Sequence, residues 1–148
     1  MVVAAKVPSC AFSVSAADDE CARTAHMQIY SATSVSTETG DVDGYELALG
    51  QHKDSTVDAL LFVYEGAANR DGIPISARIS GKNLTVEGTW NEHQIEYPSK
   101  KEIVVRHFVT IEGTLDSSWF LGTLKIEGLE TPAHVRLKRI DHIWLCKR

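Results

Sequence analysis

Hydrophobic and polar residues alternate along most of this chain with a period of two. In the segment 103–111 every odd-numbered residue except His107 is valine or isoleucine, whereas Arg106 and Thr110 fall on the opposite face. Successive side chains of a β-strand point to opposite sides of the sheet. The pattern therefore predicts a half-buried strand with His107 on its apolar face.

The same alternation recurs along the chain, and glycine-containing turns separate the runs. A serine- and threonine-rich stretch near the N-terminus, 26–37, is predicted to be a longer, weakly amphipathic strand. Before it, residues 12–16 are predicted to form a first strand and 17–23 a helical turn. The apolar residues 143–146 are expected to close the barrel as a strand or plug. The other alternating runs are 45–49, 73–79, 82–90 and 133–139.

Eight to ten strands with short connections predict an all-β fold, an antiparallel meander closed into a small barrel of about eight strands. Closure removes exposed sheet edges; a two-sheet β-sandwich is the alternative. An apolar or aromatic residue followed by Glu-Gly recurs near strand ends, where glycine permits the bends that closure requires. The length of 148 residues predicts a single domain, 1–148, with residues 1–10 as a loose N-terminal arm.

In strand number, length and meander order the chain resembles the small ligand-holding barrels of the lipocalin and avidin type. The Gly-x-Trp signature of lipocalins is missing near the first strand, and its nearest analogue, Gly88-Thr89-Trp90, lies in mid-chain. The resemblance implies a barrel with an enclosed ligand, and it transfers no family residues.

The formal net charge of −5 and the pI of about 5.6 argue against nucleic-acid partners and against docking on anionic membranes. No apolar run approaches the roughly 20 residues that a membrane-spanning helix needs, so no membrane insertion is expected. The three cysteines, Cys10, Cys21 and Cys146, form no CxxC pair. The odd count favours three reduced thiols and a cytoplasmic location, with a Cys10–Cys21 disulfide as the alternative.

Three residues are candidates for acid–base chemistry. His107 needs a polar partner on its apolar face, either as a core histidine or as a proton shuttle that contacts a ligand. His93 shares a face with Tyr97, and both are expected to line a pocket at a barrel mouth together with Trp90. The simpler interpretation of His107 is a hydrogen-bonded core histidine, and that of His93 is a half-exposed residue of an edge strand.

The aromatic residues are the ligand-binding candidates. Trp119 and Phe120 are adjacent and therefore point to opposite faces, with Phe120 toward the core and Trp119 toward a rim. Trp90 and Tyr45 complete this set. No metal site and no cofactor are expected, because neither metal-ligand spacings nor phosphate-binding loops occur.

Three functions remain open. The first is binding of a small apolar or amphipathic molecule inside the barrel. The second is a cofactor-independent cyclase or isomerase that uses the same cavity. The third is a protein-interaction or oligomerisation module with a filled core and an exposed apolar patch. A homodimer is left open as a partner.

Overall fold

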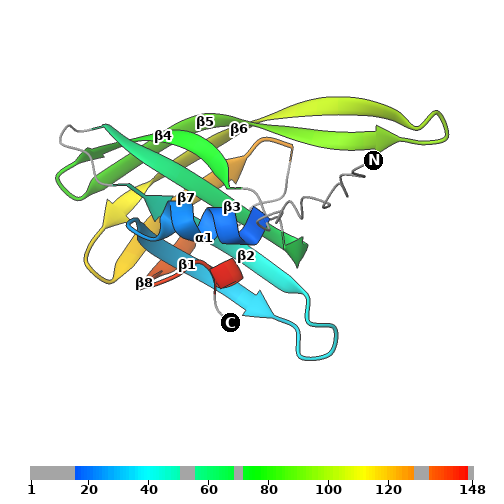
Figure 1. Cartoon of the computed structure of the whole chain (residues 1–148). Coiled ribbons are helices and arrows are strands. Elements are labelled where there is room, and N and C mark those ends of the chain that lie inside the picture. The colour runs from blue at the N-terminus through cyan, green and yellow to red at the C-terminus, as the bar shows by residue number, and fades with distance from the viewer. Residues whose placement is uncertain (1–15, 51–55, 69–71, 129–133, 147–148) are drawn as a thin grey trace, which may run out of the picture.

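Eight antiparallel strands follow one another around a closed barrel in the computed structural model, which describes residues 16–50, 56–68, 72–128 and 134–146 (Figure 1). Each strand pairs with the next, and β8 returns to pair with β1. This closure confirms the predicted barrel and excludes the two-sheet sandwich. The strands are β1 (Gln28–Val35), β2 (Val42–Leu49), β3 (Thr56–Ala68), β4 (Ile73–Ser80), β5 (Asn83–Glu96), β6 (Lys101–Leu115), β7 (Trp119–Ile126) and β8 (Val135–Ile140).

Two short helical elements flank the barrel: α1 (Ala16–Thr24) and the 3-10 turn η1 (Trp144–Cys146). The predicted helical turn is confirmed as part of α1. The predicted first strand is wrong at Ala16, which begins that helix, whereas residues 12–15 lie outside the described residues. Among the described residues, no helix is both long and apolar enough to cross a membrane.

The interior of the barrel is filled by apolar side chains from all eight strands. Tyr45 and Trp90 pack against this core near the end where β5 and β6 leave the barrel, and Ile79 and Leu115 pack against it near the other end. The core residues are Tyr30, Leu47, Leu49, Val57, Ala59, Leu61, Val63, Ile73, Ile75, Ala77, Leu84, Val86, Val109, Ile111, Phe120, Leu124, Ile126, Val135 and Leu137.

Two glycines let β6 and β7 approach closely. Gly113 and Gly122 face each other across the strand pair, and the buried ring of Phe120 lies beside both. A Cβ atom on either glycine would lie within 2.8 Å of this ring. Gly113 belongs to one of the Glu-Gly pairs, and here its role is close packing against the neighbouring strand.

A second apolar cluster covers the outside of β1, β2 and β3. Ile29, Phe62 and Tyr64 are buried there beneath the C-terminal segment, in which Ile143 is fully buried. Glu46 is also fully buried, and its Oε1 accepts hydrogen bonds from the Tyr64 hydroxyl and the Trp144 amide, both at 2.6 Å. The C-terminal segment therefore covers the outer wall and does not act as a strand or an internal plug.

A disulfide joins Cys21 of α1 to Cys146 of η1, with Cα atoms 5.6 Å apart. The expectation of three reduced thiols is therefore wrong for these two residues, and so is the alternative pairing of Cys21 with Cys10. Cys10 itself lies outside the described residues. The two partners are 125 positions apart in the chain and meet because barrel closure brings the C-terminus beside α1.

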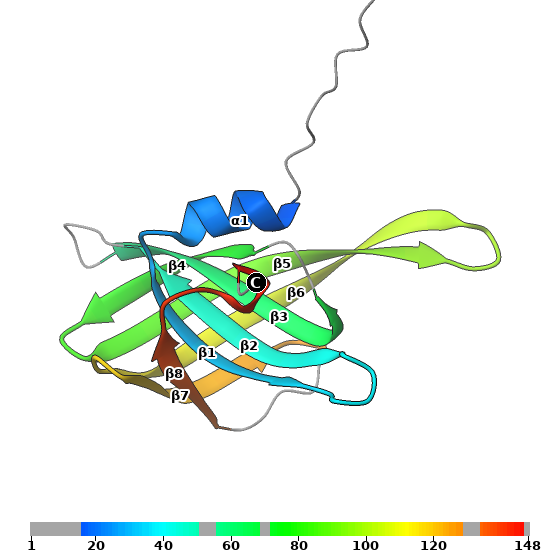
Figure 2. The same ribbon diagram turned by 60° about the horizontal axis from the view of Figure 1, so that its bottom comes forward.

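The β5–β6 hairpin extends beyond the barrel wall as a two-stranded arm. The pairing of β5 with β4 ends at Glu87, and the pairing of β6 with β7 begins at Val109, yet β5 and β6 stay paired to Glu96 and Lys101. Figure 2 shows this ribbon projecting away from the other strands. We call residues 91–96 and 101–106 the arm.

Candidate functional site

His107 lies at the base of the arm, on the face that continues the barrel interior. Its side chain is almost excluded from solvent, with 6% of the residue exposed. Nδ1 lies 2.8 Å from the carbonyl oxygen of Glu127, and Nε2 lies 2.7 Å from Oε2 of Glu92. The ring of Trp90 packs against the imidazole at a centroid distance of 5.0 Å.

The partners of His107 favour its charged form. A carbonyl oxygen and a carboxylate both accept hydrogen bonds, so an imidazole that satisfies both must carry a proton on each nitrogen. The Glu127 carbonyl, followed by the Glu92 carboxylate, raises the pKa of His107 above its usual value, although burial acts in the opposite direction. Glu92 and His107 therefore form a partly shielded ion pair at the barrel mouth.

We expect this ion pair to make the stability of the fold depend on pH. Because the folded pKa of His107 is raised, its stabilisation is fully present below the unfolded pKa of about 6.5 and is lost as the pH rises through the folded pKa. Urea unfolding of the wild type and of His107→Gln at about pH 5.5 and about pH 8.5 should show a larger difference at the acidic pH. His134→Gln, a change at an exposed histidine, is the control. An equal or larger difference at the alkaline pH would contradict the assignment.

The structure does not bring Trp90, His93 and Tyr97 together in one pocket. Trp90 is directly opposite His107 on the inner face, whereas His93 is opposite Val104 on the outer face. Tyr97 follows the end of β5 at the arm tip and is 73% exposed. The His93 Nδ1 atom instead pairs with Glu102 Oε1 at 2.8 Å in an exposed contact.

Trp119 and Phe120 lie on opposite faces, as the alternation predicts. Phe120 is fully buried in the core, opposite Leu115 and far along β6 from His107. Trp119 is half-buried on the outside of β7, with the Arg136 guanidinium 3.8 Å from its ring centroid. Neither residue shares a contact with the His107 cluster among the interactions of the described residues.

An opening in the barrel wall lies between β1 and β8, and we call it the slot. β1 pairs with β2 along its whole length, from Gln28 to Val35, but it pairs with β8 only at Ile29, Tyr30 and Ser31. The remaining half of β1 therefore separates from β8. A cavity of ≈ 430 Å³ occupies this place. It is lined by Ala32, Thr33, Ser34, Asp43, Gly44, Tyr45, His134, Val135 and Arg136.

The slot combines an apolar floor with a polar rim. Ala32, Tyr45 and Val135 lie on the inward-facing side of their strands, and Tyr45 packs directly on the core. Burial raises the pKa of the Tyr45 phenol, and the nearby Glu65 carboxylate adds to this effect, so its hydroxyl remains a neutral hydrogen-bond donor. Arg136 lines the rim from the outer face of β8, and its guanidinium is stacked on the Trp119 ring.

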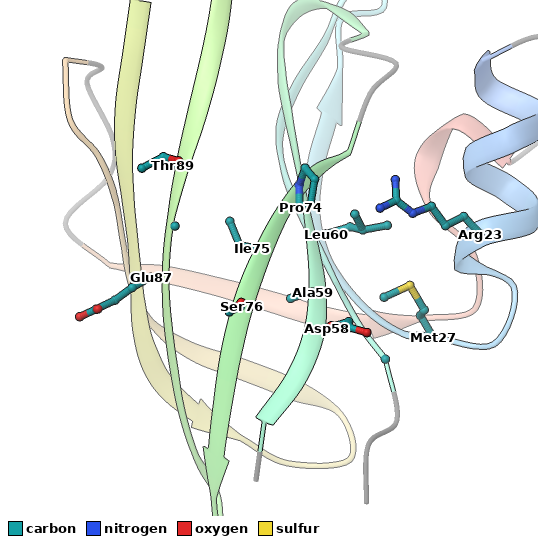
Figure 3. Close-up of a pocket in the computed structure, with 12 residues that line it drawn as sticks. Arg23, Met27, Asp58, Ala59, Leu60, Pro74, Ile75, Ser76, Glu87 and Thr89 are labelled. Atoms are coloured by element: carbon teal, nitrogen blue, oxygen red, sulfur yellow. The ribbon is translucent and has the colours of Figure 1, made fainter. Parts of the chain in front are cut away.

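A second, larger cavity of ≈ 740 Å³ follows the outside of β3, β4 and β5 beside α1. Arg23 and Met27 border it on one side, and Leu60 of β3 and Pro74 of β4 lie on the side of the strands that is nearer to them (Figure 3). In the same view the Glu87 side chain points away from Arg23 and Met27. A specific small-molecule site requires polar groups that converge on one point. The polar groups of this groove do not converge in this way.

None of the cavities described above is lined by His107, so none of them provides an enclosed substrate space beside it.

Sequence reasoning missed Glu92, Glu46 and Arg136. Each is a charged residue within an alternating strand, where the pattern predicts only a solvated face.

Comparison of the chain with protein-family models, curated proteins and solved structures gives no match.

Proposed function

We propose that this protein binds a small amphipathic molecule in the slot between β1 and β8. The observation that carries the proposal is the mismatch in pairing, in which β1 is paired along its full length to β2 but at only three positions to β8. Such a separation exposes inward-facing side chains without breaking the closed barrel.

The chemistry of the slot supports this ligand class. An apolar portion of the ligand would lie on Tyr45, Val135 and Ala32. A carboxylate or sulfonate would pair with the Arg136 guanidinium, which would turn from the Trp119 ring toward the slot. The volume of ≈ 430 Å³ falls within the range of small-molecule sites, roughly 300–1,000 Å³. The tyrosine hydroxyl would add a directional hydrogen bond.

A site in the wall differs from the interior site expected from the sequence. The interior space is occupied by the large core side chains, including Tyr30, Phe120 and Leu61, each almost completely buried. A ligand inside would have to displace them, at a cost of several kcal/mol. The slot needs no such displacement.

Filling the slot should abolish binding of an anionic naphthalene-sulfonate dye. Ala32 is exposed and lies directly opposite Tyr45, so Ala32→Trp would occupy the cavity without removing a core side chain. We expect dye affinity, measured by fluorescence titration, to fall roughly tenfold or more, because the apolar contact area is lost. Arg136→Gln should weaken the anionic dye by several-fold through loss of the charge-assisted contact.

Thr85→Trp is the matched control, since Thr85 is exposed on β5, away from the slot. It should leave dye affinity unchanged. Unchanged affinity in Ala32→Trp, with its far-UV spectrum intact, would show that the dye binds elsewhere and would overturn the proposal.

The Cys21–Cys146 disulfide also bears on location. Such bonds persist in oxidising compartments and are rare in the cytosol. We infer that the protein works in an oxidising compartment, in place of the cytoplasmic location expected from the cysteine count.

A further inference from the structure

The arm presents an unpaired strand edge to solvent. β6 pairs with β5 from Lys101 onward, but within the described chain no strand pairs with its other edge before Val109. The carbonyl of Phe108 accepts a hydrogen bond from the Glu127 amide on that other edge. Backbone groups alternate in direction along a strand, so the even-numbered residues Glu102, Val104 and Arg106 point their N–H and C=O groups toward the free edge.

Apolar side chains accompany this edge. Val104 and Ile95 lie on the outer face of the arm and are 57% and 60% exposed. Phe108 follows the arm on the same face of β6 and is 54% exposed. A two-stranded ribbon is only marginally stable by itself in water. An exposed edge without proline or a bulge is a template for another strand, so the arm has the properties of an interaction element.

We propose that the arms of two copies of this chain pair antiparallel through their β6 edges, around a two-fold axis at Val104. In this register Val104 faces Val104 of the second copy, and Ile103 faces Val105. Glu102 faces Arg106 of the second copy, and the symmetry repeats this ion pair. The even-numbered residues that the free edge exposes are the ones that would exchange backbone hydrogen bonds.

The charges along β6 select this register. Centring the pair on Ile103 would place Lys101 opposite Val105 and Glu102 opposite Val104, so neither charge would face an opposite charge. Centring it on Val105 would place Arg106 opposite Val104. Neither Arg106 nor Glu102 would then face a residue of opposite charge. Opposite charges on directly facing residues stabilise a strand pair, whereas like charges destabilise it. The segment 102–106 is therefore self-complementary only about Val104.

The charge of the whole arm also favours a second copy as its partner. The chain as a whole carries a net charge of −5, which opposes self-association. The hairpin 91–106 is neutral, because its acidic and basic residues are equal in number. These residues are Glu92, Glu96 and Glu102 on one side and Lys100, Lys101 and Arg106 on the other. The projection of the arm beyond the barrel leaves room for the second barrel (Figure 2). This proposal is independent of ligand binding in the slot.

Analytical ultracentrifugation over a dilution series tests the pairing. The wild type should show a concentration-dependent monomer–dimer equilibrium, weak because the interface is small. Glu102→Arg and Arg106→Glu should each weaken the dimer roughly tenfold or more, since each places like charges opposite each other twice. The double variant Glu102→Arg/Arg106→Glu should recover the wild-type equilibrium.

Mixing the two single variants gives the sharpest outcome. One copy then carries two arginines and the other two glutamates, so a heterodimer should form although neither variant dimerises well alone. Glu112→Arg is the control, a reversal on the same face of β6 where the strand is already paired on both sides. A monomeric wild type at every concentration, or no recovery in the mixture and the double variant, would overturn the proposal. Glu102→Arg also removes the exposed His93–Glu102 contact within one chain. Loss of that contact cannot explain a dimer that returns in the double variant or in the mixture.

Discussion

Replacing Gly113 or Gly122 by alanine should lower the free energy of unfolding by about 3 kcal/mol. A methyl group on Gly113 would meet the backbone oxygen of Leu121, and one on Gly122 would meet the backbone oxygen of Glu112. Each would also lie within 2.8 Å of the Phe120 ring. Backbone atoms in a paired sheet cannot move aside as a flexible side chain does, so β6 and β7 would have to separate.

Urea unfolding followed by tryptophan fluorescence measures this loss. Gly50→Ala is the matched control, because its added Cβ would lie 3.3 Å from the nearest atom, the Asp58 carbonyl oxygen, and its backbone is not left-handed. We expect the control to change the free energy by less than about 1 kcal/mol. Similar losses in all three variants would mean that the close approach of β6 and β7 is not what these glycines provide.

Removing the Cys21–Cys146 disulfide is expected to cost about 3–5 kcal/mol of stability. The bond closes a loop with a sequence separation of 125 residues, so it greatly restricts the unfolded chain. It also ties α1 to the C-terminal segment, whose Ile143 covers the apolar outer face of the barrel. Cys21→Ser/Cys146→Ser should therefore also bind more of a hydrophobic dye.

A reductant provides the internal control for this prediction. Wild-type protein unfolded in urea with dithiothreitol should match the double variant, and the double variant should not respond to the reductant. A wild type whose stability is the same with and without reductant would contradict a stabilising disulfide.

Alternation alone was sufficient to predict most of the barrel. The odd-numbered face of 103–111 is the inner face of β6, and His107 does meet a backbone carbonyl there. The same periodicity continues into the arm, where neither face is covered by another sheet layer. A period of two indicates which side chains share a face, but it does not indicate whether neighbouring strands exist. The projection of residues 91–106 was therefore not predictable.

The outer wall escaped prediction for a related reason. Glu46 alternates with apolar residues and is expected to be solvated, yet the C-terminal segment buries it completely. That segment reaches β2 only after the chain has gone around the whole barrel, which also brings Cys146 to Cys21. Such contacts form only when the barrel closes, and the local alternation of residues does not predict them.

The slot could be predicted only in part. Tyr45 stood out as an aromatic residue on an inward-facing position, and it does line the cavity. The sequence pattern does not mark Ala32, Val135 or Arg136 as site residues, because their proximity depends on where the β1–β8 pairing stops. That point is fixed by the stagger of strands in the closed barrel, which no single segment specifies.

Chemical-shift mapping of the protein with the anionic naphthalene-sulfonate dye tests the central claim most directly. The claim is that the barrel interior is filled and that the ligand enters through its wall. We predict that the perturbed amides cluster at 32–34, 43–45 and 134–136, which line the slot. Perturbations centred instead on core residues such as Leu61 and Ile111, or on the groove beside α1, would contradict it.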